Sequence, residues 1–187
     1  MGRIARWSAG GIVWAAFVGA GFWMLLGYAG AAGRAANAPT RWPAGAITTR
    51  GSERGTLVMV VHPHCPCSRA SLAELERLLA RNGDLTAARV VFVGPVGGDL
   101  HAIAERIPGV TSVAGDAAEA ARFGAFTSGQ VLYYDADGVL RFSGGITSAR
   151  GHEGDNSARD LLENIIRGSS TGDGRARVYG CPLTTGA

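Results

Sequence analysis

Residues 57–81 read LVMVVHPHCPCSRASLAELERLLAR, and this stretch decides the fold. Its first five residues form a continuous apolar run, which is typical of a strand buried in a parallel sheet. Leucines then recur at helical spacing, so the sequence predicts a helix over residues 67–81, with Ser68 or Ser71 as its cap. Two cysteines and two histidines therefore lie at a strand-to-helix junction. Unpaired backbone N–H groups and the helix dipole stabilise a thiolate at such a place.

The chain beyond this unit continues to alternate between short apolar runs and helical patterns. We expect strands at 89–93 and 110–113, helices at 99–106 and 117–123, a hairpin of strands 130–134 and 139–142, and a closing helix at 157–167. The tail from residue 169 is rich in Gly, Ser and Thr, and we expect it to be loosely ordered. A βαβ unit followed by a hairpin and a helix predicts an α/β fold, with a central mixed β-sheet flanked by helices.

The first thirty residues have a different character. No charged side chain lies between Arg6 and Arg34. Residues 10–29 can cross a bilayer core of about 30 Å as a helix that rises roughly 1.5 Å per residue. Arg3 and Arg6 precede this helix, so the positive-inside rule places residues 1–9 in the cytoplasm and the domain in the periplasm or another extracytoplasmic space. A cleaved signal peptide is the alternative, and it also exports the body to a compartment that permits disulfides.

The predicted organisation is therefore a single-pass protein of the cell membrane. Residues 30–50 are rich in Ala, Gly and Pro and predict a linker. A domain over residues 51–168 and a tail over residues 169–187 follow. The formal charge is +3, and the excess lies in the first forty residues, because 15 Arg and 15 acidic residues cancel from residue 41 onward. A neutral domain argues against a nucleic-acid partner.

The junction HPHCPCSRASL resembles the active site of the thioredoxin-like superfamily, a CxxC motif between a strand and a helix. The resemblance covers residues 51–168 and implies a thioredoxin-like fold. Together with the later GGITSARGHEGDN and the terminal GCPL, the junction resembles the RedB-type branch of bacterial thioredoxin-like proteins. The resemblance implies thiol–disulfide exchange with a protein thiol or disulfide substrate. It places Cys65 at the nucleophilic position and Ser68 at the position of the second cysteine.

This chain departs from the family pattern at two positions. Because Ser68 replaces the second cysteine, the partner of Cys65 is either Cys67, in a small strained ring, or Cys181 in the tail. In the family a Thr-Pro with a cis proline faces the active site, whereas this chain has Thr127 followed by Ser128. The resemblance implies that losing the proline leaves room for a ligand beside the thiols.

A second reading of the junction is a copper or zinc carrier. His62, His64, Cys65 and Cys67 offer soft and borderline donors that suit Cu(I) or Zn(II). A third reading is a docking domain that keeps the fold without the chemistry.

Other polar residues near the motif have supporting roles in the redox reading. His64 is the expected proton partner of the thiols. Arg69 is expected either to orient the site or to lie on the helix surface. The glycine-flanked loop 144–156 carries Arg150 and His152, and it is either a polar surface loop or a substrate or metal contact.

Overall fold

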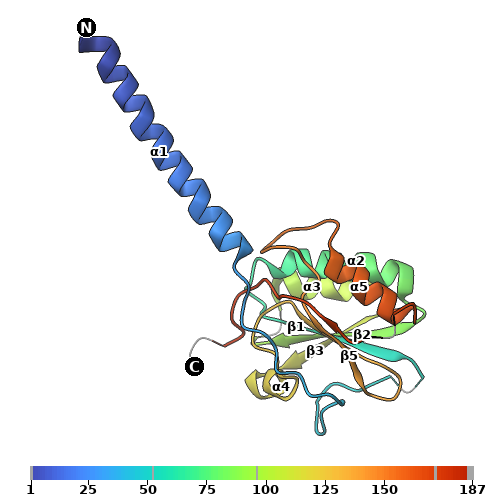
Figure 1. Ribbon diagram of the computed structural model, residues 1–187. Coiled ribbons are helices and arrows are strands. Elements are labelled where there is room, and N and C mark those ends of the chain that lie inside the picture. Colours follow the sequence, from blue (N-terminus) through green and yellow to red (C-terminus); the bar gives the residue numbers. More distant parts are fainter. Residues whose placement is uncertain (1, 52, 96, 171, 185–187) are drawn as a thin grey trace.

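The computed structural model describes residues 2–51, 53–95, 97–170 and 172–184, and it describes the side chains of the first helix from Gly10 onward. The side chains of Arg3 and Arg6, on which the predicted orientation rests, therefore lie outside the described residues. A globular α/β domain carries a single long helix that stands away from it (Figure 1).

The central sheet has six strands in the order β3-β2-β1-β4-β5-β6. These strands are β1 (Gly55–Val61), β2 (Thr86–Val93), β3 (Val110–Gly115), β4 (Gln130–Tyr134), β5 (Leu140–Gly144) and β6 (Gly174–Arg175). β1, β2 and β3 are parallel, β4 runs antiparallel to both β1 and β5, and β6 is parallel to β5. The sheet is mixed, as the sequence predicts, and β1 lies at its centre.

The helices of the domain are α2 (Ser68–Asn82), α3 (Gly98–Arg106), α4 (Ala117–Arg122) and α5 (Ser157–Ile166). Figure 1 shows α2, α3 and α5 on one face of the sheet and α4 on the other. All seven residues of β1 are buried, and alternate residues point into two separate apolar clusters, one on each face. The central strand is therefore apolar from Leu57 to Val61, because neither of its faces meets water.

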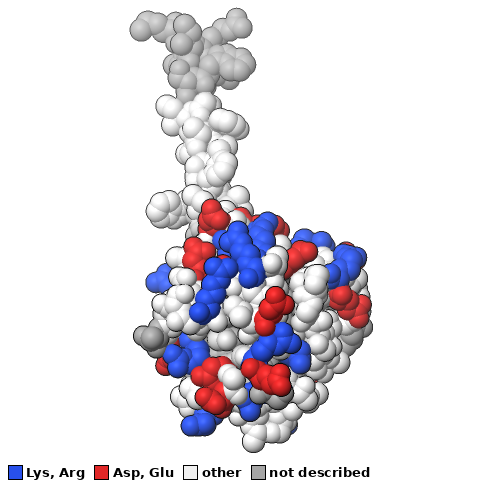
Figure 2. Space-filling model, turned by 90° about the vertical axis from the view of Figure 1, so that its right-hand side faces the viewer, with Lys and Arg blue, Asp and Glu red and all other residues white. Residues whose placement is uncertain are grey.

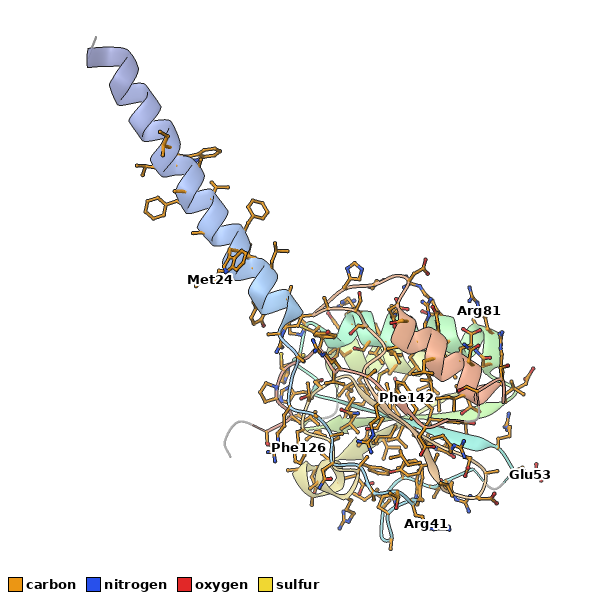
Figure 3. All side chains as sticks on the ribbon, in the orientation of Figure 1. Met24, Arg41, Glu53, Arg81, Phe126 and Phe142 are labelled. Atoms are coloured by element: carbon orange, nitrogen blue, oxygen red, sulfur yellow. The ribbon has the colours of Figure 1, made fainter. Side chains whose placement is uncertain are left out.

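Helix α1 (Gly2–Gly30) lies outside these two apolar clusters. Residues 10–30 have a mean hydropathy of 1.7, and none of this stretch is buried, so large apolar side chains stand free along it (Figure 3). Within the described part of the chain it is the one helix long and apolar enough to cross a membrane. On the face of the domain shown in Figure 2, acidic and basic side chains are interspersed. Both observations agree with a neutral domain behind an apolar segment.

The segment between α1 and β1 packs against the face of the sheet opposite α2. Trp42 lies edge-on to Phe123 and to Tyr134, with ring centroids 5.3 Å apart in both pairs. The Tyr134 hydroxyl donates to the Pro39 carbonyl at 3.2 Å, and the backbone N–H of Leu140 donates to Thr40 at 2.9 Å. The predicted linker therefore belongs to the outer layer of the domain over much of its length.

The expectation of a loosely ordered tail is wrong for the part that the structure describes. After β6, the backbone of Ala176 donates to Ser143 and that of Gly145 donates to Arg177, so the tail continues along β5. Val178 and Leu183 are buried and anchor it. A segment rich in small residues can be ordered when it packs against a neighbouring element. Here the glycines let the backbone of the tail approach the sheet closely.

Candidate active site

The HPHCPC segment forms tight turns between the end of β1 and the start of α2. The N–H of Cys65 donates to the His62 carbonyl at 3.1 Å, and the N–H of Ser68 donates to the Cys65 carbonyl at 3.0 Å. Cys67 is the residue that precedes the helix, and no side chain caps that helix. The prediction that Ser68 or Ser71 caps α2 is therefore wrong.

The Ser68 hydroxyl has another partner, because it lies 2.7 Å from the hydroxyl of Ser128. The Ser128 hydroxyl in turn accepts from the backbone N–H of His62 at 2.7 Å. The Ser68 side chain also hydrogen-bonds Cys65 in a way that lowers the pKa of that thiol, so the Ser68 hydroxyl donates to the sulfur and accepts from Ser128. The residue at the family's proline position thus belongs to a hydrogen-bonded chain that ends at the thiol. No described peptide bond is cis, that of Ser128 included.

The tail brings the third cysteine to this place. It runs antiparallel to residues 126–128, with a bridge between Thr127 and Pro182. The N–H of Ser128 donates to the Cys181 carbonyl at 2.8 Å, and the N–H of Leu183 donates to the Phe126 carbonyl at 3.0 Å. These bonds fix the backbone on both sides of Cys181 beside the start of α2.

The three sulfur atoms of Cys65, Cys67 and Cys181 lie within 4.8 Å of one another, and all three thiols are free. The exposed fraction of Cys65 is 2% and that of Cys67 is 9%. Cys181 is partly buried. The sequence left Cys67 and Cys181 open as partners of Cys65, and both lie next to it.

The thiols differ in how readily they ionise. Burial alone raises the pKa of Cys65, but hydrogen bonds from the side chain and backbone of Cys181, and from Ser68, outweigh it and lower that pKa. Burial, together with the neighbouring Cys65, raises the pKa of Cys67. The same two causes raise the pKa of Cys181 to about 12. Cys65 is therefore the thiol that the site prepares to be a thiolate.

The two histidines of the motif stand apart from the sulfur cluster. Among the described residues, the ligand atoms that converge are the three sulfurs, and neither histidine belongs to that group. His62 is half-buried and accepts the N–H of His64 at Nδ1 over 3.2 Å, while His64 is exposed. The two rings lie 5.8 Å apart, centroid to centroid.

Of the other predicted residues, Thr127 lies beside the tail, whereas Arg69 and His152 are exposed. Thr127 is buried and its hydroxyl donates to the Arg34 carbonyl at 3.0 Å, which joins the segment after α1 to the tail-binding strand. Arg69 is exposed and lies 3.8 Å from Asp99. His152 is exposed in the loop before α5.

Arg150 is the member of that loop which reaches the site. Its guanidinium donates through Nη1 to the carbonyl of Gly180, and its positive charge lowers the pKa of both Cys67 and Cys181 against the larger effect of burial. Its Nε–H is buried and has no hydrogen-bond partner among the described residues. Sequence placed Arg150 in a polar loop, but nothing local distinguishes it from its neighbours there.

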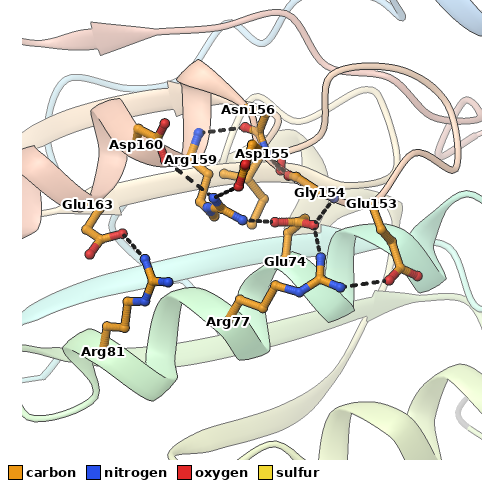
Figure 4. Close-up of polar contacts among 11 residues, drawn as sticks. Glu74, Arg77, Arg81, Glu153, Gly154, Asp155, Asn156, Arg159, Asp160 and Glu163 are labelled. Carbon is orange, nitrogen blue, oxygen red and sulfur yellow. Dashed lines mark hydrogen bonds and ion pairs between the residues drawn. The ribbon is translucent and has the colours of Figure 1, made fainter.

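Sequence reasoning also missed a buried ion-pair network behind the site. Glu74 of α2 is fully buried and accepts from Arg159 of α5 at 2.5 Å, from the Gly154 backbone at 2.7 Å and from Arg77 (Figure 4). Arg77 also pairs with Glu153 at 3.1 Å. The network ties α2 to α5 and to the loop that carries Arg150. Each residue reads in the sequence as an ordinary charge on a helix or loop surface.

A groove of about 540 Å³ opens beside the tail. His62, Gly94 and Asp116 line it on the side of the sheet, and Pro182 and Thr184 line it on the side of the tail. The groove therefore adjoins the tail next to Cys181, and the three cysteines are not among the residues that line it.

Comparison with known proteins supports the fold. No protein-family profile and no curated protein matches the chain by sequence. An uncharacterised conserved protein from Geobacillus kaustophilus superposes with a TM-score of 0.60 at 15% identity, over 84% of this chain and 93% of that one. A hypothetical protein from Sinorhizobium meliloti gives 0.57 at 19% identity, over 83% and 96%.

A secreted disulfide oxidoreductase from Mycobacterium tuberculosis gives a lower TM-score of 0.43 at 14% identity, over 62% of this chain and 81% of that one.

The order of elements settles the fold class within the described residues. A βαβ unit of β1, α2 and β2 is followed by the β4–β5 hairpin and α5, with β1 between β2 and β4. The domain has a thioredoxin-like fold, and an apolar helix precedes it.

Proposed function

We propose that this chain is a membrane-anchored, extracytoplasmic thiol–disulfide oxidoreductase in which Cys65 is the nucleophile. The observation that carries the proposal is the place of Cys65 just before α2, with the sulfurs of Cys67 and Cys181 within 4.8 Å; hydrogen bonds from Cys181 and Ser68 also lower the pKa of Cys65. A thiolate is the attacking species in exchange, and a helix N-terminus is a site where it is favoured. The motif residues also support membership of the RedB-type branch.

The exchange has two steps. The Cys65 thiolate attacks a disulfide of the client, forming a mixed disulfide and releasing one client thiolate. A second thiol of the site then attacks Cys65, which releases the other client thiolate and leaves an intramolecular disulfide. Two electrons pass to the client, and a dithiol donor must return them before the next turnover. The reverse sequence oxidises a client dithiol.

Cys181 is the proposed resolving thiol. It donates to Cys65 through its side chain, and its backbone also bonds to that sulfur. The pKa of Cys65 is lowered and that of Cys181 is raised to about 12, so Cys65 is the thiol of the pair that ionises first and Cys181 gives up its proton as it attacks. His64 is the proposed proton acceptor in this step, since its exposed ring can exchange protons with solvent.

The test traps the intermediate. Reduced full-length protein in detergent, with chelator present, is mixed with insulin as a disulfide substrate. We expect Cys181→Ser to accumulate an insulin adduct on Cys65, wild type to form it only transiently, and Cys65→Ser to form none. An adduct of equal amount in Cys65→Ser, or a Cys65 that alkylates with the pH profile of an ordinary thiol, would overturn the proposal.

Anchoring by α1 is tested separately. An uncleaved anchor predicts that the chain stays in the membrane fraction after alkaline carbonate washing, and that its measured mass includes the N-terminal segment. Release of a shortened chain would instead identify the segment as a cleaved signal.

A further inference from the structure

The three sulfurs form a donor set that disulfide exchange does not need, since exchange uses two thiols. Metal–thiolate bonds of about 2.3 Å in a trigonal plane place three sulfurs about 4 Å apart. The sulfurs of Cys65, Cys67 and Cys181 are already within 4.8 Å of one another. Small side-chain rotations are therefore enough to make the cluster a three-coordinate site.

The chemistry of the donors selects the ion. Soft thiolates favour Cu(I), which is stable with few ligands. Structural Zn(II) sites take four protein ligands in a tetrahedron, and within the described residues the group supplies three. Much of the cluster is shielded from water, because Cys65 and Cys67 are 2% and 9% exposed and Cys181 is partly buried.

The charge around the cluster also fits. Cu(I) is held by three thiolates through three copper–sulfur bonds, any thiol among them losing its proton to solvent and copper keeping its oxidation state, so the bound group carries two negative charges. Arg150 is the cation facing this position, since its charge acts on both Cys67 and Cys181. Its buried Nε–H has no partner among the described residues, and an anionic copper–thiolate centre supplies an acceptor for it.

We propose that the reduced protein binds one Cu(I) ion through Cys65, Cys67 and Cys181. This donor set differs from the histidine-containing set that the motif suggests, because it leaves out His62 and His64 and recruits the tail. The site shares Cys65 with the proposed exchange reaction, so copper and a client compete for the same sulfur.

The experiment titrates anaerobic, reduced full-length protein in detergent with Cu(I) held by bathocuproine disulfonate, whose colour reports the copper that the protein removes. We expect one copper per chain. We expect Cys67→Ser and Cys181→Ser each to weaken binding by more than the roughly 10–100-fold typical of a lost outer-sphere partner. The matched control H62A/H64A keeps the wild-type affinity.

A second measurement uses only the wild-type protein, so its result does not depend on whether a variant folds. Alkylation of the copper-loaded wild type, read by mass spectrometry, should show all three thiols protected together. Failure to withdraw copper from the competitor, wild-type affinity in Cys181→Ser, or loss of binding in H62A/H64A would each overturn the proposal. The insulin-trapping test is run with chelator, so its outcome is independent of copper.

Discussion

Gly180 is the position at which a single methyl group should separate the tail from the site. A Cβ built on Gly180 lies 1.9 Å from the carbonyl oxygen of Ser128, and real Cβ atoms essentially never come closer than 3.0 Å to another heavy atom. The clash is with backbone, which cannot rotate away. Gly180→Ala therefore requires the tail to move by at least about 1 Å.

That movement has a defined chemical consequence. The Ser128 N–H bond to Cys181 at 2.8 Å lies one residue away and must lengthen or break. The side-chain and backbone bonds from Cys181 are the two largest influences that lower the pKa of Cys65. Without them, burial dominates and the pKa of Cys65 rises. Overpacking of this kind typically lowers the free energy of unfolding by about 1–3 kcal/mol. If the tail detaches, the loss is limited to the stability that the docked tail contributes.

The assay is iodoacetamide alkylation of Cys65 across pH, with peptide mapping to identify the thiol. We expect the midpoint of Gly180→Ala to lie above that of wild type, because the thiolate is no longer favoured. Gly172→Ala is the matched control, since it makes the same change in the same tail where no atom lies within 4 Å. An unchanged midpoint in Gly180→Ala, or an equal shift in Gly172→Ala, would refute the reasoning.

Three further predictions concern the residues around the site. Ser68→Ala removes a hydroxyl that lowers the pKa of Cys65, so the alkylation midpoint should rise while thermal stability changes little; a midpoint at the wild-type value contradicts the hydroxyl chain. Glu74→Gln leaves the buried Arg159 without its closest carboxylate and should lower the free energy of unfolding, measured in urea, by about 3 kcal/mol. The double variant E74L/R159M should recover part of that loss. A loss below about 1 kcal/mol in Glu74→Gln contradicts the stabilising role of the network. Burial raises the pKa of Tyr134, so the folded state keeps its proton above pH 10 while the unfolded state loses it, and stability falls as pH rises from there. Tyr134→Phe should lose about 1 kcal/mol at neutral pH with the bond to Pro39 and should show a smaller alkaline loss; an identical pH profile of unfolding contradicts this.

The order of strands and helices is predictable from the sequence because each element leaves a local pattern. The apolar run of β1 and the leucines of α2 identify the central βαβ unit, and the Asp-Gly turn identifies the hairpin. Boundaries differ by a few residues: β2 begins at Thr86 rather than residue 89, because Thr and Ala at its start carry little periodic signal.

The site is less predictable, because its decisive contacts join residues far apart in the chain. Glu74 and Arg159 are 85 positions apart, and no local pattern pairs them. The tail docks because Gly180 fits closely against Ser128. From composition alone, a glycine in such a tail predicts flexibility and not a close contact. The place of Cys65 just before a helix is predictable from the sequence. The convergence of all three cysteines required the fold.

The contacts of Arg150 join the end of α1 to the sulfur cluster. Its N–H donates to the carbonyl of Ala29 at 3.0 Å, its guanidinium lies 5.0 Å from the Tyr28 ring, and the same guanidinium reaches Gly180 beside Cys181. If α1 crosses the membrane, one side chain spans the distance between the end of the anchor and the reactive sulfurs. The site then works at the membrane surface, with no stalk to extend its reach. Partners that diffuse in the same membrane, with cysteines just above it, are met by a search in two dimensions. Soluble partners must approach the lipid surface before exchange can begin.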